Sequence, residues 1–131
     1  MNKELIIQSK LDNMSLVENF IDEISIALSI VSDLYGNLLI STIEAVTNAI
    51  VHGNDNNPDK VVRVNVESDD KKITVTVSDE GEGFDVSVVP DPTKPNYIEQ
   101  PNGRGIFLMR NLADKVKFEK NGSVVILTFK L

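Results

Sequence analysis

The chain has 131 residues, of which 41% are hydrophobic and 25% charged, a composition typical of one soluble globular domain. It contains no cysteine and one histidine, His52, which excludes disulfides, thiolate metal sites, cysteine nucleophiles and poly-histidine metal sites. Its 20 acidic and 13 basic residues give a net charge of -7, which disfavours nucleic acid and anionic lipid as partners. We expect one cytoplasmic domain over residues 1–131, with no stretch of about 18 apolar residues that could cross a membrane.

The first half of the chain predicts a strand followed by two helices. Residues 4–10 contain a short apolar run that is typical of a strand. Asn13 and Ser15 are alternative caps of an amphipathic helix. Its apolar residues recur at helical spacing, at Leu16, Val17, Phe20, Ile21, Ile24, Ala27, Leu28 and Val31. A second helix is expected from Ser32 or Asp33 to about Gly53, where glycine favours termination.

Two hairpins and one helix are predicted in the second half. Valine and isoleucine alternate with polar residues over 62–67 and 73–77, which predicts a hairpin with one apolar face. Residues 79–105 lack periodicity and hold four of the five prolines, so we expect a long loop or lid there. A helix follows over about 104–114, and a final hairpin pairs 116–120 with 123–131 across the two-residue turn Asn121-Gly122.

The order of these elements predicts the fold class. The helices are grouped and the strands come in hairpins, whereas a parallel sheet would need strands and helices in alternation. We therefore expect an α+β two-layer sandwich, with a mostly antiparallel sheet that has helices on one face and water on the other.

The most informative motif lies on the second predicted helix, where Glu44, Asn48 and His52 are spaced i, i+4, i+8. At about 100° per residue they form one polar line, apart from an apolar stripe. The stripe consists of Leu39, Ile43, Val46 and Ile50. A carboxylate one turn from a carboxamide offers a base and a ligand, or two oxygen ligands, for a hard cation such as Mg²⁺. The alternative is a solvated helix face, although the small Ala45 and Ala49 favour close approach by another group.

A second motif, residues 78–84 (SDEGEGF), directly follows a predicted strand. Gly81 and Gly83 would let the backbone approach a flat ligand closely. Asp79, at the end of the strand, can accept a hydrogen bond from an exocyclic amine. The alternative is a tight acidic turn.

A third motif, residues 102–110 (NGRGIFLMR), places Gly103, Arg104 and Gly105 at the start of the third predicted helix. Free backbone amides at a helix start, together with Arg104, can hold phosphate oxygens. The spacing is that of neither a Rossmann fingerprint nor a Walker loop, so the alternative is the flexible start of an ordinary helix.

Together, and in this order, the three motifs resemble those of the GHKL nucleotide-binding superfamily, which includes gyrase, heat-shock chaperones, histidine kinases and mismatch-repair ATPases. The resemblance covers about residues 30–131. It implies the Bergerat ATP-binding fold, as one histidine kinase-like ATP-binding domain over residues 1–131. The compact form with the GRGIFLM box is similar to bacterial anti-sigma-factor serine/threonine kinases.

The resemblance implies roles for the residues of the first two motifs. Glu44 would be the general base or would orient the attacking hydroxyl, and Asn48 would hold the Mg²⁺ that bridges the phosphates of ATP. Asp79 would bind the adenine amino group. Gly81 and Gly83 would shape the adenine pocket.

The remaining roles fall in the third motif and the last hairpin. Arg104, with the amides of Gly103 and Gly105, would contact the terminal phosphates and assist catalysis. Ser123 stands where relatives usually have Thr beside the adenine, and it keeps the hydroxyl. His52 closes the helix motif and would cap or pack there.

Several members of the superfamily do not fit this chain. A sensor histidine kinase needs a phosphoacceptor histidine on a preceding helical hairpin, whereas His52 lies inside the nucleotide motif. Gyrase-like and chaperone-like members need a following domain, so an independent ATPase machine is not expected.

Two hypotheses of different class remain. In the first, the protein is a serine/threonine kinase that uses ATP and Mg²⁺ to phosphorylate an antagonist (anti-anti-sigma) protein and that sequesters a sigma factor. In the second, it is a nucleotide-gated protein-binding module in which no phosphate moves. A scaffold with an inactive pocket is a third, simpler alternative. The resemblance also suggests a homodimer, which no sequence pattern indicates.

Overall fold

The computed structural model describes residues 1–81 and 103–131, so Gly83 and most of the predicted lid lie outside the described residues. The described strands and α-helices are β1 (Asn2–Gln8), α1 (Met14–Ala27), α2 (Ser32–Asn48), β2 (Val61–Ser68), β3 (Lys72–Ser78), α3 (Gly103–Leu112), β4 (Lys115–Glu119) and β5 (Val124–Lys130). Two 3-10 turns, Leu11–Asn13 and Lys120–Gly122, and one π-helix, Ala49–Gly53, complete the described elements. Each predicted helix and strand is present, with shifted ends.

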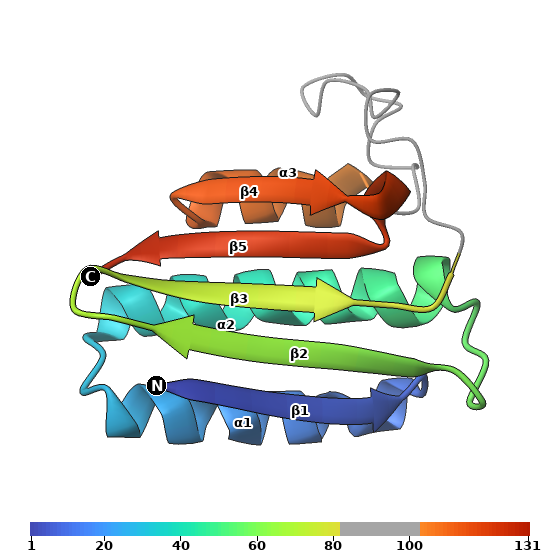
Figure 1. The fold of residues 1–131 in the computed structure, drawn as a ribbon, viewed down its shortest axis with the longest axis horizontal. Helices are drawn as coiled ribbons and strands as arrows, with labels where there is room; N and C mark the ends of the chain where they lie inside the picture. Colours follow the sequence, from blue (N-terminus) through green and yellow to red (C-terminus); the bar gives the residue numbers. More distant parts are fainter. Residues whose placement is uncertain (82–102) are drawn as a thin grey trace.

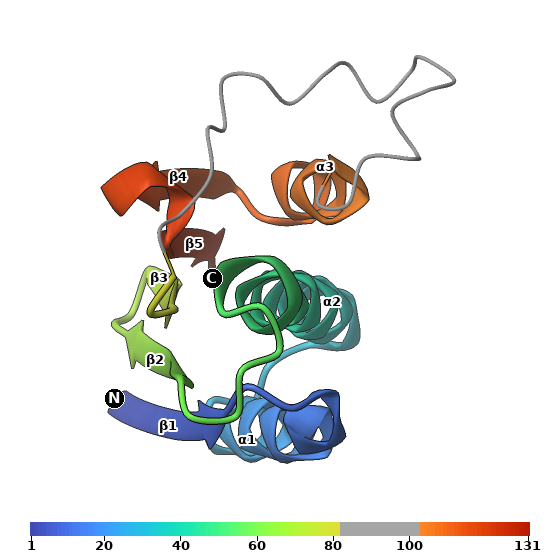
Figure 2. The same ribbon diagram turned by 90° about the vertical axis from the view of Figure 1, so that its right-hand side faces the viewer.

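The five strands form one sheet in the order β1-β2-β3-β5-β4, and all neighbouring pairs are antiparallel. Helices α1, α2 and α3 cover one face of the sheet, with α2 between the other two (Figures 1 and 2). The prediction of a two-layer α+β fold is confirmed. Strand β3 joins the N-terminal strands to the C-terminal hairpin, because it pairs with both β2 and β5.

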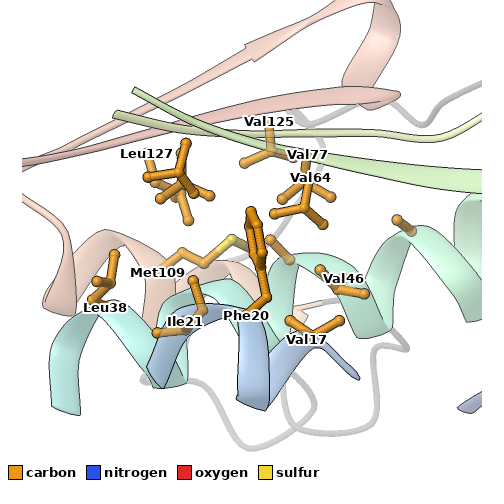
Figure 3. Close-up of a cluster of buried hydrophobic side chains, with 14 of the residues drawn as sticks. Val17, Phe20, Ile21, Leu38, Val46, Val64, Val77, Met109, Val125 and Leu127 are labelled. Carbon is orange, nitrogen blue, oxygen red and sulfur yellow. The ribbon is translucent and has the colours of Figure 1, made fainter. Parts of the chain in front are cut away.

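A hydrophobic core fills the space between the sheet and the helices. The predicted alternation on β2 and β3 is confirmed, since one face of this hairpin is buried: Val62, Val64, Val66, Ile73, Val75 and Val77. Phe20, from α1, points toward the sheet residue Val64 (Figure 3), and Met109, from α3, is buried in the same core. Full burial of a side chain of this size contributes about 1.5–3 kcal/mol. The core therefore fixes the helices, and with them the polar ends of α2 and α3.

Helix α1 begins after one of the predicted caps and ends earlier than predicted. Asn13 occupies the N-cap position, but its side chain makes no capping bond and its amide donates to the Gln8 carbonyl (3.0 Å). Ser15 lies inside the helix, and its hydroxyl donates to the Asp12 carbonyl (3.5 Å). The helix stops at Ala27, before Ser29, whose φ of 52° is left-handed. Val31 lies beyond the helix and is 69% exposed, and Leu16 is 47% exposed within it.

The buried face of α2 is rotated from the predicted stripe. Val46 and Ile50 are buried as expected, but Leu39 and Ile43 are only partly buried. The other fully or nearly buried positions of the helix are Leu38, Ser41, Thr42 and Ala45. Because α2 contacts α1 and α3 as well as the sheet, it buries small residues on its flanks that an apolar stripe does not reveal.

The same helix corrects our expectation about membrane-spanning stretches. By length and composition alone, the segment Ser32–Gly53 is long and apolar enough to cross a membrane, with a mean hydropathy of 1.2. In this fold it is the central helix of the helical layer, and Leu38, Val46 and Ile50 are fully buried in the core. Its apolar character is explained by packing inside the domain.

The last hairpin has a longer connection than predicted. Glu119 pairs with Val124, so four residues rather than Asn121-Gly122 alone connect β4 to β5. Lys120, Asn121 and Gly122 have φ angles of 49°, 58° and 88°, three consecutive left-handed residues. A two-residue turn accommodates at most two such residues, and this extra one lengthens the loop.

We expect two isoleucines of α1 to differ sharply in their effect on stability. Ile21 is fully buried, whereas Ile26 is 79% exposed. Ile21→Ala should lower the free energy of unfolding by about 2–5 kcal/mol, because it opens a cavity in the core. Ile26→Ala, the matched control, should change it by no more than about 0.5 kcal/mol. Urea unfolding measures both, and similar losses would contradict the packing of α1.

Candidate functional site

The first and third sequence motifs meet where α2 and α3 pack together. A Cβ atom added to the buried Gly105 would lie 2.8 Å from Asn48 Nδ2 and 3.1 Å from Glu44 Oε2. Glu44 and Asn48 are both partly exposed and one helical turn apart. The absence of a side chain at Gly105 thus leaves a small polar cradle between a carboxylate, a carboxamide and the first turn of α3.

The Asn48 amide is unpaired within this cradle. Its Nδ2 atom is buried and has no hydrogen-bond partner among the described residues. A buried donor without a partner costs about 1–3 kcal/mol, and such groups are uncommon away from functional sites. The side chain is therefore suited to an external oxygen ligand, such as a phosphate or a metal-bound water.

The described residues contain no group of three or more His, Asp or Glu side chains that could hold a metal by themselves. Mg²⁺ commonly uses one or two protein ligands and takes the rest from phosphates and water. The donor set of Asn48 and Glu44 fits an ion of that kind and does not fit a metal held by protein alone.

A π-helix follows Asn48 directly and contains His52. In the segment Ala49–Gly53 the Asn54 amide donates to the Ala49 carbonyl at 2.8 Å, across five residues instead of four. This wider turn alters the rotation per residue after Asn48. The partly buried His52 lies at the end of the helix, and it lacks an ion pair with the described residues.

The second motif packs against the end of this π-helix. Asp79 donates its backbone amide to the Ser123 carbonyl (2.9 Å), and its Oδ1 accepts from the Gly81 amide (2.8 Å). A Cβ atom at Gly53 would collide with the Asp79 carboxylate, and one at Gly81 would collide with the Gly53 carbonyl oxygen. Both glycines are thus required for close approach between the end of α2 and the end of β3.

Burial raises the pKa of Asp79 above its ordinary value, although the Gly81 amide and the Lys60 charge act in the opposite direction. The carboxylate is partly buried, so it has lost part of its hydration. It remains a hydrogen-bond acceptor, and a hydrogen bond from any additional donor would stabilise its charged form.

A narrow pocket connects Asp79 with Asn48. It encloses only about 10 Å³, the room for one water molecule. Its lining residues are Ala45, Asn48, Ala49, Val77, Asp79, Met109, Phe118, Gly122 and Val125. Apolar walls with polar groups at the ends are typical of small-molecule sites, and a flat ring would enter this one only if its walls separated.

The other predicted residues lie around this pocket. Arg104 is exposed in the first turn of α3, which begins at Gly103, and it forms no ion pair with the described residues. The Ser123 hydroxyl donates to the Lys120 carbonyl (2.9 Å), within its own turn. The neighbouring Gly122, which the sequence analysis did not single out, lines the pocket instead.

The sequence analysis also missed Asn54. Asn54 is fully buried, and its side chain makes three hydrogen bonds to residues near the site. The only signal in the sequence was an asparagine immediately after the glycine that ends a helix.

Comparison with known proteins gives a consistent result. The model of the histidine kinase-like ATPase domain family matches residues 7–129. An anti-sigma F factor of Heyndrickxia coagulans is 34% identical over 103 residues, which are 72% of this chain and 68% of that protein. An anti-sigma F factor of Halalkalibacterium halodurans is 40% identical over 78 residues, 56% of this chain and 52% of that protein.

A further relative carries an enzyme name. The serine-protein kinase RsbW of Oceanobacillus iheyensis is 29% identical over 100 residues, 72% of this chain and 63% of that protein. The match to these three relatives thus spans between 52% and 68% of their length.

We expect the Asp79 carboxylate to reduce stability in the absence of a ligand. Because its pKa is raised in the folded state, its favourable contribution is complete below the unfolded pKa of about 3.9 and is lost as the pH rises through the folded pKa. Asp79→Asn keeps an acceptor for the Gly81 amide, so it should match the parent at acid pH and exceed its stability at neutral pH. Urea unfolding across this pH range tests the prediction, which a pH-independent difference would contradict.

Proposed function

Because this chain belongs to the histidine kinase-like ATPase domain family, we propose that it binds ATP with Mg²⁺, phosphorylates a serine or threonine of an antagonist protein, and sequesters a sigma factor. The family is one of ATP-binding domains, and the relatives named above are anti-sigma factors and a serine-protein kinase. The observation that carries the proposal is the meeting of Glu44, Asn48 and Gly105, which brings a carboxylate, a carboxamide and a helix start into one cradle.

Adenine recognition is assigned to Asp79. Its carboxylate lines the pocket and is partly dehydrated, so a hydrogen bond from the adenine amine would offset part of the cost of its burial. Guanine and hypoxanthine carry a carbonyl oxygen at the corresponding position, which would face the carboxylate and repel it. The apolar walls Ala49, Val77 and Met109 would hold the faces of the ring.

Phosphate binding is assigned to the opposite end of the pocket. Asn48 would hold Mg²⁺ through its side-chain oxygen, and its buried amide would donate to a phosphate or to a water on the metal. Bound Mg²⁺ supplies positive charge that offsets the negative charge of the phosphates. The amides of Gly103 and Gly105, with the exposed Arg104, would contact the terminal phosphate at the start of α3.

Glu44 is assigned the role of general base. Its carboxylate borders the same cradle as Asn48. The partner hydroxyl would form the new bond to the terminal phosphorus while the bond to the leaving oxygen of ADP breaks, and Glu44 would accept the hydroxyl proton. Asn48 and Arg104 would supply the rest of the rate enhancement, because they would position the phosphates and stabilise their charge in the transition state.

The second candidate function is a nucleotide-gated binding module. The observation in its favour is the narrowness of the pocket, because a nucleotide would have to separate α2 from the β5 side and so alter the surface around α3. In that case the Glu44 carboxylate would have no proton to accept.

Two glycine substitutions test the cradle. Gly105→Ala would place a methyl group against the Asn48 amide, so it should weaken Mg²⁺-dependent ATP binding at least about tenfold, the loss of one charge-assisted contact. Gly36→Ala, the control in α2, has open space around it and should raise stability by about 0.5–1 kcal/mol without changing affinity. Calorimetric titration with and without Mg²⁺ measures both. Equal affinities in the two variants would remove Gly105 from the site.

Glu44→Gln separates the two candidate functions. It should retain binding of ATP and partner but slow phosphorylation of the antagonist by about 10²- to 10⁴-fold, the usual contribution of a general base. Arg104→Ala should weaken ATP binding and transfer together, because a phosphate contact acts in both the ground and transition states. The measurement is transfer of labelled phosphate from ATP to candidate antagonists. A parent protein that binds ATP and a sigma factor without phosphorylating any of them would favour the binding module.

A further inference from the structure

Asn54 joins three segments of the chain through its buried side chain. Its Nδ2 atom donates to Ser9 Oγ (2.8 Å), after the end of β1, and to the Val61 carbonyl (3.0 Å), at the start of β2. Its Oδ1 atom accepts from the backbone amide of Glu80 (2.8 Å), after the end of β3. Both amide protons and the amide oxygen therefore have partners.

These bonds include a closed ring of three residues, which we call the Asn54 ring: Asn54, Val61 and Glu80. Asn54 donates to the Val61 carbonyl, the Val61 amide donates to Glu80 Oε2 (2.6 Å), and the Glu80 amide donates back to Asn54. Glu80 is held at its backbone and at its side chain, although the residue is exposed. The turn after β3 thus has two anchors outside the β3 strand.

Asn54 and Glu80 are the immediate neighbours of the contact between Gly53 and Asp79. Gly53 precedes Asn54 and touches the Asp79 carboxylate, while Glu80 follows Asp79. A bond between Asn54 and Glu80 therefore fixes the distance between the two backbones on either side of that carboxylate. Loss of the bond would leave the Glu80 backbone held only through its side chain, and it would loosen the turn that carries both Asp79 and Gly81.

We infer that Asn54 is a positioning residue for base recognition, which holds the Asp79 carboxylate toward the pocket through the Glu80 backbone. The inference rests on the proposed function, because it assumes that Asp79 recognises adenine. It assigns a task in nucleotide selection to a residue outside the three sequence motifs. Asn54 itself contacts neither the base nor the phosphates, and it acts on the ligand only through Asp79.

Nucleotide selectivity tests the inference. If Asn54 had a purely structural role, its loss would lower the stability of the protein and leave the selectivity between nucleotides unchanged. The affinities for ATP and inosine triphosphate would be measured by calorimetric titration, well below the unfolding midpoint of each variant. Asn54→Ala should weaken ATP binding about tenfold, the size of one lost charge-assisted hydrogen bond, and leave inosine triphosphate within about twofold. The preference for ATP should therefore nearly disappear.

Ser9→Ala is the matched control. It removes one partner of the Asn54 amide but leaves the bonds to Val61 and Glu80 in place. It should lower stability and keep the full preference for ATP. If Ser9→Ala and Asn54→Ala change the preference for ATP equally, the bond between Asn54 and Glu80 is not what positions Asp79, and the inference is overturned.

The parent protein provides a measurement that does not depend on the variant being folded. The Glu80 amide should be protected from hydrogen exchange without nucleotide, because its acceptor is a buried oxygen; fast exchange there in a folded protein would overturn the inference. If the parent prefers ATP and the Asn54→Ala variant keeps that preference, the inference about Asn54 is overturned while the assignment of Asp79 to adenine stands. A parent that binds both nucleotides equally overturns the adenine assignment and the inference with it.

Discussion

The end of the π-helix that follows α2 and the turn that follows β3 lie in direct contact at Gly53 and Gly81. This is possible only because Gly53 and Gly81 face one another, with the Asp79 carboxylate against Gly53. The π-helix makes the contact by adding a wide turn to the end of α2. The Asp79 end of the candidate site depends on this contact, because without it Asp79 would not lie beside a pocket that also reaches Asn48.

The site contains two groups that are unfavourable on their own. The Asn48 amide is buried without a partner, and Asp79 is an acid whose burial opposes ionisation. Ordinary hydrophobic burial offsets these costs, and the residues responsible, such as Leu38, Val46 and Ile106, lie in the same helices as the site. A ligand with both phosphate oxygens and an exocyclic amine would satisfy both groups at once. Such a division between a stable core and a strained site is common in proteins that bind ligands.

The parts that local patterns could predict are those whose physical cause is local. The alternation in β2 and β3 follows from the side-chain period of a strand, and the relation of Glu44 to Asn48 follows from the helical turn. The burial of Ser41 and Thr42 could not be predicted in this way, because it depends on the position of α1 and α3 beside α2. Asn54 was missed for the same reason, since its partners Ser9 and Glu80 are distant in sequence.

The strand order β1-β2-β3-β5-β4 has a consequence for how the domain loses its structure. The N-terminal strands carry Asp79, and the C-terminal part of the chain carries Gly105, so the two ends of the pocket belong to different halves of the sequence. The β3–β5 pairing, the contacts of α2 and the bond from the Asp79 amide to the Ser123 carbonyl join these halves in the described part of the chain. A ligand that touched Asp79 at one end and Gly105 at the other would act as a non-covalent cross-link between them. Binding of such a ligand would therefore oppose the separation of the two halves when the domain unfolds.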